Sequence, residues 1–150
     1  MAVSPFPEGY HRITPYLVVD GAAKAIEFYT KHFGAEEFVR MPGPEGKVMH
    51  AEMKVGDAVF MLADGMDEFK GPSAYGGSPV SLLLYVEKVD EVVAGAVAAG
   101  AQLLRPVQDQ FYGDRSGTLK DPFGHVWTIA THVEDVTPEE MERRMAQMGS

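Results

Sequence analysis

Hydrophobic positions along the first part of the chain change period in an order that predicts a strand, a helix and three more strands. Residues 13–19 are rich in β-branched and aromatic side chains and predict a strand. From Ala22 to Phe33 the apolar side chains recur at spacings of 4, 3 and 4, which places them on one face of a helix. Asp20 is expected to cap this helix and Gly34 to end it. Three further strands are predicted over 36–41, 47–55 and 58–63.

The same order of elements returns after a long loop that is predicted over 64–79. Asp90 is expected to cap the second helix and Gly100 to end it. The strands of this second unit are predicted over 80–86, 101–106, 115–120 and 125–131. Thr14 and Ser81 are 67 residues apart and Gly34 and Gly100 are 66 apart, so the pattern indicates two copies of one βαβββ module.

The C-terminal residues predict a short helix of a different kind. Thr137, Pro138 and Glu140 provide a capping residue, a proline in the first turn and a glutamate three residues after the cap. Met141, Met145 and Met148 then lie on one face. This stripe could pack on the chain's own body or on a partner subunit.

Composition and charge narrow the class of protein. The chain has 150 residues, with 13 basic and 22 acidic side chains and a net charge of −9, which argues against nucleic acid as a partner. Cysteine is absent, so thiol catalysis and disulfides are excluded. No apolar run approaches a membrane span and the start lacks the pattern of a signal peptide. We therefore predict a cytoplasmic protein with no membrane partner.

We expect one domain over residues 1–150. Module one occupies about 12–63, the linker about 64–79, module two about 80–133 and the C-terminal helix about 137–148.

Two runs of residues resemble a known superfamily. The first is Ile26-Glu27-Phe28-Tyr29 followed by His32-Phe33-Gly34-Ala35, and the second is Asp109 to Gly117 followed by Asp121-Pro122-Phe123-Gly124-His125-Val126-Trp127. With the duplication, they resemble the vicinal oxygen chelate superfamily, in particular its PhnB-like branch of glyoxalase/bleomycin-resistance proteins. The resemblance implies an α+β fold in which two tandem βαβββ modules form a curled eight-stranded sheet around a concave pocket. It also implies a homodimer and, in the metalloenzymes, a divalent metal held by His and Glu side chains from four strands.

The sequence departs from this pattern at the metal-ligand positions. Thr14 and Ser81 occupy the first strand of each module, and the closing strands offer Phe60-Met61-Leu62 and Trp127-Thr128-Ile129. Hydroxyls, a thioether and hydrocarbons do not make a divalent site. No metal ligand and no cofactor are therefore predicted, although a divalent metal recruited by His50, Glu52 and His125 stays an alternative.

Strand alternation in module one singles out His50 and Glu52. If the strand over 47–55 alternates, Met49, Ala51 and Met53 face the helix layer, and His50 and Glu52 lie together on the concave face. They could form a general acid/base pair or a polar floor for a ligand. The alternative is that both are ordinary surface residues.

In module two, Tyr112, Asp114, Arg115 and Trp127 are the candidate ligand-binding residues. Arg115 could clamp an anionic group, Asp114 could orient it and Tyr112 could stack or donate a hydrogen bond. The alternatives are an internal Asp–Arg salt bridge and, for Trp127, core packing.

The resemblance to bleomycin-resistance proteins implies a small-molecule-binding protein that sequesters an antibiotic or a metabolite, and the missing metal ligands predict that it does so without a metal. The alternative is a glyoxalase-like lyase, isomerase or dioxygenase that uses a recruited metal or the His50/Glu52 pair as catalytic residues. A third reading is an assembly or regulatory partner whose concavity is filled by side chains.

Overall fold

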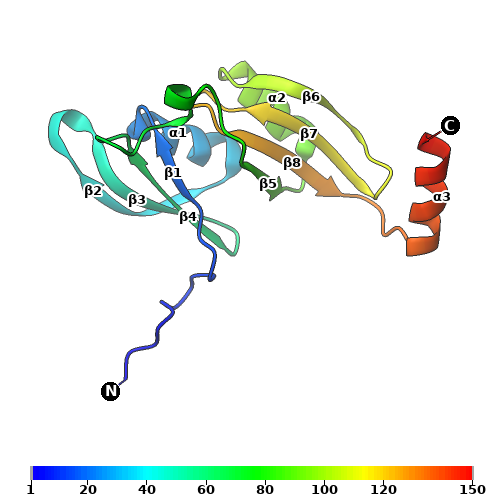
Figure 1. Cartoon of the computed structure of the whole chain (residues 1–150), viewed down its shortest axis with the longest axis horizontal. Coiled ribbons are helices and arrows are strands. Elements are labelled where there is room, and N and C mark those ends of the chain that lie inside the picture. Colours follow the sequence, from blue (N-terminus) through cyan, green and yellow to red (C-terminus); the bar gives the residue numbers. More distant parts are fainter. Residues whose placement is uncertain (1, 150) are drawn as a thin grey trace. The chain divides into compact units, whose positions relative to one another are not determined.

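This computed structural model describes residues 2–149. These residues fold into eight strands and three α-helices, and two short 3-10 helices lie in the loops (Figure 1). The chain divides into two compact units, one that ends at Ser78 and one that begins at Pro79. The first contains β1 Tyr16–Val19, α1 Ala22–Phe33, β2 Glu36–Pro42, β3 Val48–Val55 and β4 Ala58–Asp64. The second contains β5 Ser81–Tyr85, α2 Val89–Ala98, β6 Gln102–Asp109, β7 Asp114–Lys120, β8 Val126–His132 and α3 Pro138–Met148.

Each unit carries a four-stranded mixed sheet, and the two sheets have the same topology. Their strand orders are β1-β4-β3-β2 and β5-β8-β7-β6. The first strand of each unit pairs in parallel with the last, and the other pairings are antiparallel. The predicted α+β fold of two tandem βαβββ modules with a C-terminal helix is therefore confirmed, and its eight strands are divided into two sheets.

Helix α1 buries the face that its periodicity predicts. Ala22, Ile26, Tyr29 and Phe33 are all buried, and Tyr29 is fully so. The helix ends at Gly34, whose φ of 71° is the left-handed conformation that ends helices. Burial of this face is what holds the helix on its sheet, since a 12-residue helix has little stability alone.

The predicted cap of α1 is wrong, because a distant strand supplies it. Gly21, with φ 95°, separates Asp20 from the helix, and no side chain of the N-cap residue bonds the first turn. Instead Asp64 Oδ1, at the end of β4, accepts hydrogen bonds from the backbone N–H groups of Gly21 and Ala22, both at 2.9 Å. Asp64 Oδ2 also accepts the N–H of Val48 at 2.7 Å. One carboxylate thus joins α1, β3 and β4.

Module two repeats this device with a different side chain. The predicted cap Asp90 lies inside the first turn of α2, and the N-cap residue is Lys88, which makes no side-chain cap hydrogen bond. Thr131 Oγ1, in β8, accepts the backbone N–H of Val89 at 3.1 Å and donates to the carbonyl of Val86 at 2.7 Å.

Helix α3 has the predicted cap, and its methionine stripe is largely exposed. Thr137 Oγ1 accepts the N–H of Glu140 at 3.2 Å. Arg144 joins the helix to the rest of module two by donating to the carbonyl of Phe111 at 2.9 Å. No α3 residue is buried, and Met145 and Met148 are 55% and 65% exposed. Within residues 2–149, no helix has the length and apolar character needed to cross a membrane.

Candidate functional site

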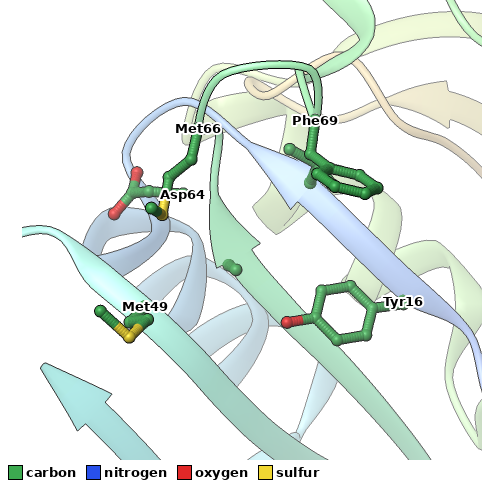
Figure 2. A pocket seen from close by; sticks show the side chains of 7 residues that line it. Tyr16, Met49, Asp64, Met66 and Phe69 are labelled. Carbon is green, nitrogen blue, oxygen red and sulfur yellow. The ribbon is translucent and has the colours of Figure 1, made fainter. Parts of the chain in front are cut away.

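A cavity of about 480 Å³ opens on the first module (Figure 2). Its walls come from β1, β3, the end of β4 and the loop that follows, through Tyr16, Val18, Met49, Ala63, Asp64, Met66 and Phe69. Four of these are large side chains that water reaches: Tyr16, Met49 and Met66 are about half exposed, and Phe69 is 73% exposed. Large apolar side chains gathered around one hollow are typical of a binding site.

Met49 faces this cavity because β3 does not alternate regularly. Ala51 and Met53 are buried, as the alternation predicts. The same alternation predicts Met49 beside them, and that is wrong: Val48 is buried and Met49 is exposed to the cavity. The register of β3 against β2 shifts at this point, and such a bulge turns one side chain to the other face.

His50 and Glu52 lie on one face of β3, where the alternation predicts them, and contact each other. His50 Nε2 is 2.8 Å from Glu52 Oε2, and the two side chains are 20% and 13% exposed. Two tyrosines complete the cluster. The hydroxyl of Tyr10 donates to Glu52 Oε1, and that of Tyr16 lies 2.8 Å from His50 Nδ1.

The pKa shifts in this cluster indicate where its protons lie. Hydrogen bonds from Tyr10 and His50 hold the pKa of Glu52 below its usual value, so the group is a carboxylate at neutral pH. Burial raises the pKa of Tyr16, and the charge of Glu52 adds to the effect. Glu52 can then only accept, so a neutral His50 carries its proton on Nε2 and accepts the Tyr16 hydroxyl proton at Nδ1.

The His50–Glu52 pair is connected to the cavity by Tyr16. His50 and Glu52 do not line the hollow, whereas Tyr16 does. Figure 2 shows the Tyr16 ring at its wall, with the hydroxyl directed toward the strand that carries Met49. Tyr16 therefore connects the partly buried His50–Glu52 pair, through its contact with His50, to the apolar cavity.

In module two, a buried aspartate organises a second cluster. Asp114 is 5% exposed and accepts a hydrogen bond from the Tyr85 hydroxyl at 2.8 Å. Its other oxygen lies 2.8 Å from His132 Nδ1, and His132 Nε2 lies 2.7 Å from Asp135. Hydrogen bonds to Asp135 and then Asp114 raise the pKa of His132. Asp114 is thus occupied within the chain.

The other candidates of module two are also engaged within the chain or away from the cavity. Arg115 donates to Asp90 at 2.8 and 2.9 Å and to Asp109 at 3.1 Å, so it forms internal ion pairs with partners other than Asp114. Trp127 is 5% exposed and donates to a carboxylate in the preceding turn, which favours core packing. Tyr112 is 41% exposed and its ring contacts that of Phe111 edge to face. None of the four module-two candidates lines the module-one cavity.

The donor set described here does not fit a divalent metal. Across residues 2–149, no three His, Asp or Glu side chains gather in a way that could hold an ion. The cluster below the cavity offers one imidazole and one carboxylate, and its other members are phenols. Protein sites for zinc use three or four imidazole, thiolate or carboxylate ligands.

None of the seven residues that line the cavity was predicted from the sequence as a site residue, and the reasons differ. Tyr16 lies in a predicted strand, and alternation there gives a face without showing that the face is hollow. Met66 and Phe69 lie in the predicted loop, where their backbones pair through an isolated bridge with N–H to carbonyl distances of 2.8 Å. The loop sequence has no pattern that predicts this turn.

Comparisons with known proteins agree with this fold. The sequence matches the family model of the glyoxalase/bleomycin resistance protein/dioxygenase superfamily over residues 9–129. An uncharacterized protein of Mycobacterium tuberculosis is 40% identical over 142 residues, which cover 91% of this chain and 84% of that protein.

Two solved structures share the architecture. A PhnB protein from Bacillus cereus, described as a putative 3-demethylubiquinone-9 3-methyltransferase, has a TM-score of 0.65 and 23% identity, over 81% of this chain and 99% of that one. A fosfomycin resistance protein from Listeria monocytogenes has a TM-score of 0.62 and 18% identity, over 87% of this chain and 97% of that one. At these identities the likeness concerns the fold.

Proposed function

Because the chain belongs to the glyoxalase/bleomycin resistance protein/dioxygenase superfamily, we propose that it binds a small organic molecule without a metal and sequesters an antibiotic or a metabolite. The observation that carries this proposal is the module-one cavity. Its volume of about 480 Å³ lies within the range of small-molecule sites, about 300–1,000 Å³. A protein of the same fold that is named for resistance to fosfomycin supports an antibiotic as one class of ligand.

The lining of the cavity supports an apolar ligand. Met49 and Met66 are flexible and polarisable, and such side chains adapt to ligands of varied shape. Phe69 and Tyr16 offer aromatic faces for stacking. A reading in which side chains fill the concavity does not account for these exposed groups.

The neutral dye Nile red provides a direct test, since its fluorescence rises and shifts to the blue in apolar surroundings. We expect saturable binding to the full chain, and weaker binding to Met66→Ser. Met41→Ser is the matched control, because Met41 is a half-exposed methionine on β2 that does not line the cavity. Absence of saturable binding, or equal losses in both variants, would overturn the proposal.

A second candidate function is proton transfer at a carbon next to a carbonyl. The hydrogen-bonded series from Tyr16 to His50 to Glu52 favours this activity, because a base oriented by a carboxylate is the usual arrangement for activating a hydroxyl. Tyr16 would take the substrate proton while its own proton moves to His50 Nδ1.

Deuterium exchange at the carbons next to the carbonyl of 4-phenylbutan-2-one, followed by NMR in D₂O, tests this activity. We expect exchange above the buffer rate, lost in His50→Ala and kept in His32→Ala. Exchange at the buffer rate would reject catalysis while leaving the binding proposal in place.

We further propose a homodimer in the cytoplasm. The exposed Met145 and Met148 support an intersubunit contact through α3, because apolar side chains of this size are normally covered. Light scattering on the full chain should give twice the monomer mass, and a chain that ends before Thr137 should give the monomer. A truncated chain that stays dimeric would exclude α3 as the essential contact.

A further inference from the structure

The polar groups of the cavity have their proton positions set by the cluster beneath it. Glu52 is a carboxylate that accepts from Tyr10 and from His50 Nε2. In the neutral form of His50, Nδ1 then carries a lone pair, and the Tyr16 hydroxyl, 2.8 Å away, donates to it. The Tyr16 oxygen is left with its lone pairs alone.

The second polar group of the cavity wall is also an acceptor. Asp64 takes three backbone N–H groups at 2.7–2.9 Å. Although burial alone would raise its pKa, the backbone hydrogen bonds of Val48, Ala22 and Gly21 and the charge of Lys47 lower it overall. Asp64 is therefore ionised at neutral pH and donates nothing. The only side-chain oxygens that line the cavity, those of Tyr16 and Asp64, both accept.

The aromatic rings of the cavity wall and the charge of the chain also favour a cationic ligand over an anionic one. Phe69 and Tyr16 present aromatic rings, and the faces of such rings attract cations. None of the described residues that line the cavity is a lysine or an arginine, and the whole chain carries a net charge of −9. Lys47 lines an adjoining hollow, and its charge acts on Asp64. A ligand carboxylate would therefore meet no donor among the side chains that line the cavity itself.

Resting on the proposed binding function, we propose that the ligand is an organic amine, with an apolar body on Met49, Met66 and Phe69 and an N–H group that donates to the Tyr16 oxygen. His50 is a positioning residue in this site. It does not touch the ligand, and it keeps the Tyr16 hydroxyl turned away so that the oxygen accepts.

Three probes of matched size separate this inference from binding in general. They are 4-phenylbutylamine, 4-phenylbutan-2-one and 4-phenylbutyrate, which offer a cationic donor, a neutral acceptor and an anionic acceptor. Methionine methyl NMR locates each probe, since Met49 and Met66 line the cavity and Met145 lies far along the chain on α3. We expect the amine to shift the Met49 and Met66 signals and to bind at least about tenfold more tightly than the carboxylate.

Two variants test the role of the proton position. Tyr16→Phe removes the acceptor and should weaken the amine while leaving the ketone unchanged. His50→Ala frees the Tyr16 hydroxyl to donate, so the ketone should gain affinity relative to the amine. Tyr85→Phe is the matched control, because it removes a phenol of module two that donates to Asp114. It should change neither the amine-to-ketone nor the amine-to-carboxylate affinity ratio.

The outcomes distinguish the two proposals. If no probe shifts Met49 or Met66, the binding function itself fails. If the probes bind but the amine is no tighter than the carboxylate, or if His50→Ala leaves the amine-to-ketone ratio unchanged, the donor-ligand inference is wrong and the binding function stands.

Discussion

The carboxylate of Asp64 should be one of the largest single polar contributions to the stability of module one. In Asp64→Ala, three backbone N–H groups lose their acceptor. The N–H of Gly21, an exposed residue, can turn to water, so its loss resembles removal of an N-cap, about 1 kcal/mol. The N–H groups of Ala22 and Val48, residues 0% and 2% exposed, stay buried and unpaired at about 1–3 kcal/mol each. The free energy of unfolding should therefore fall by about 3 kcal/mol or more.

Urea unfolding followed by far-UV circular dichroism measures this loss. Thr131→Val is the matched control, since Thr131 accepts one helix amide in the equivalent place of module two. It should cost about 1 kcal/mol. Asp64→Asn keeps one acceptor oxygen and should fall between the two. If Asp64→Ala costs no more than Thr131→Val, the reasoning from unsatisfied amides is refuted.

The pH dependence of the same variant gives an independent check. The pKa of Asp64 is lower in the folded chain than its ordinary value of 3.8. Its contribution is therefore fully present above that pH and is lost as the pH falls through the folded pKa. The difference between the wild type and Asp64→Ala should be constant near neutrality and should shrink below pH 3.8.

Two further predictions concern module two. Hydrogen bonds to Asp135 and a second aspartate raise the pKa of His132 above 6.5, so its stabilising effect is complete below that pH and is lost as the pH rises through the folded value. NMR titration should place its midpoint above 6.5 and Asp135→Asn should lower it; a wild-type midpoint at or below 6.5 contradicts this. Gly113→Ala should lower the melting temperature far more than Gly46→Ala, since a Cβ at Gly113 would lie 2.1 Å from the carbonyl of Glu134, whereas Gly46, also at positive φ, has nothing within 4 Å. Equal shifts in the two variants would argue against that clash.

The order of elements could be predicted from the sequence because burial sets it locally. The face of α1 that contains Ile26 and Tyr29 is buried as its spacing requires, and Gly34 ends the helix where a left-handed residue is needed. Strand β6 runs past the predicted end at Pro106 to Asp109, since a register shift at this proline lets the ladder continue.

The helix caps and the cavity could not be predicted because they depend on contacts between distant residues. Aspartate is a common helix N-cap, which is why Asp20 was predicted. The carboxylate that accepts the N–H of Ala22 belongs instead to Asp64, 44 positions later. The pairing of His50 with Glu52 follows from alternation, whereas its connection to Tyr16 requires the parallel pairing of β1 with β4. A single bulge in β3 turns the Met49 side chain to the other face of the sheet, where it forms part of the cavity wall.

The two copies of the module differ at the place where the first copy holds its polar cluster. Tyr16 and Glu52 pair with the same residue of β4, and the residues that pair in the same way with Thr128 of β8 are Leu83 and Thr118. Phenol and carboxylate in the first copy thus correspond to a hydrocarbon and a hydroxyl in the second, and the Thr118 hydroxyl is 3.0 Å from that of Thr128.

This divergence has a consequence for stoichiometry. A duplicated fold offers two equivalent places for a ligand, but at these positions only the first copy has the phenol and the His–Glu pair that the proposed site needs. Calorimetric titration should therefore saturate at one molecule per polypeptide. In any assembly of identical copies, the number of occupied sites should equal the number of chains and not twice that number.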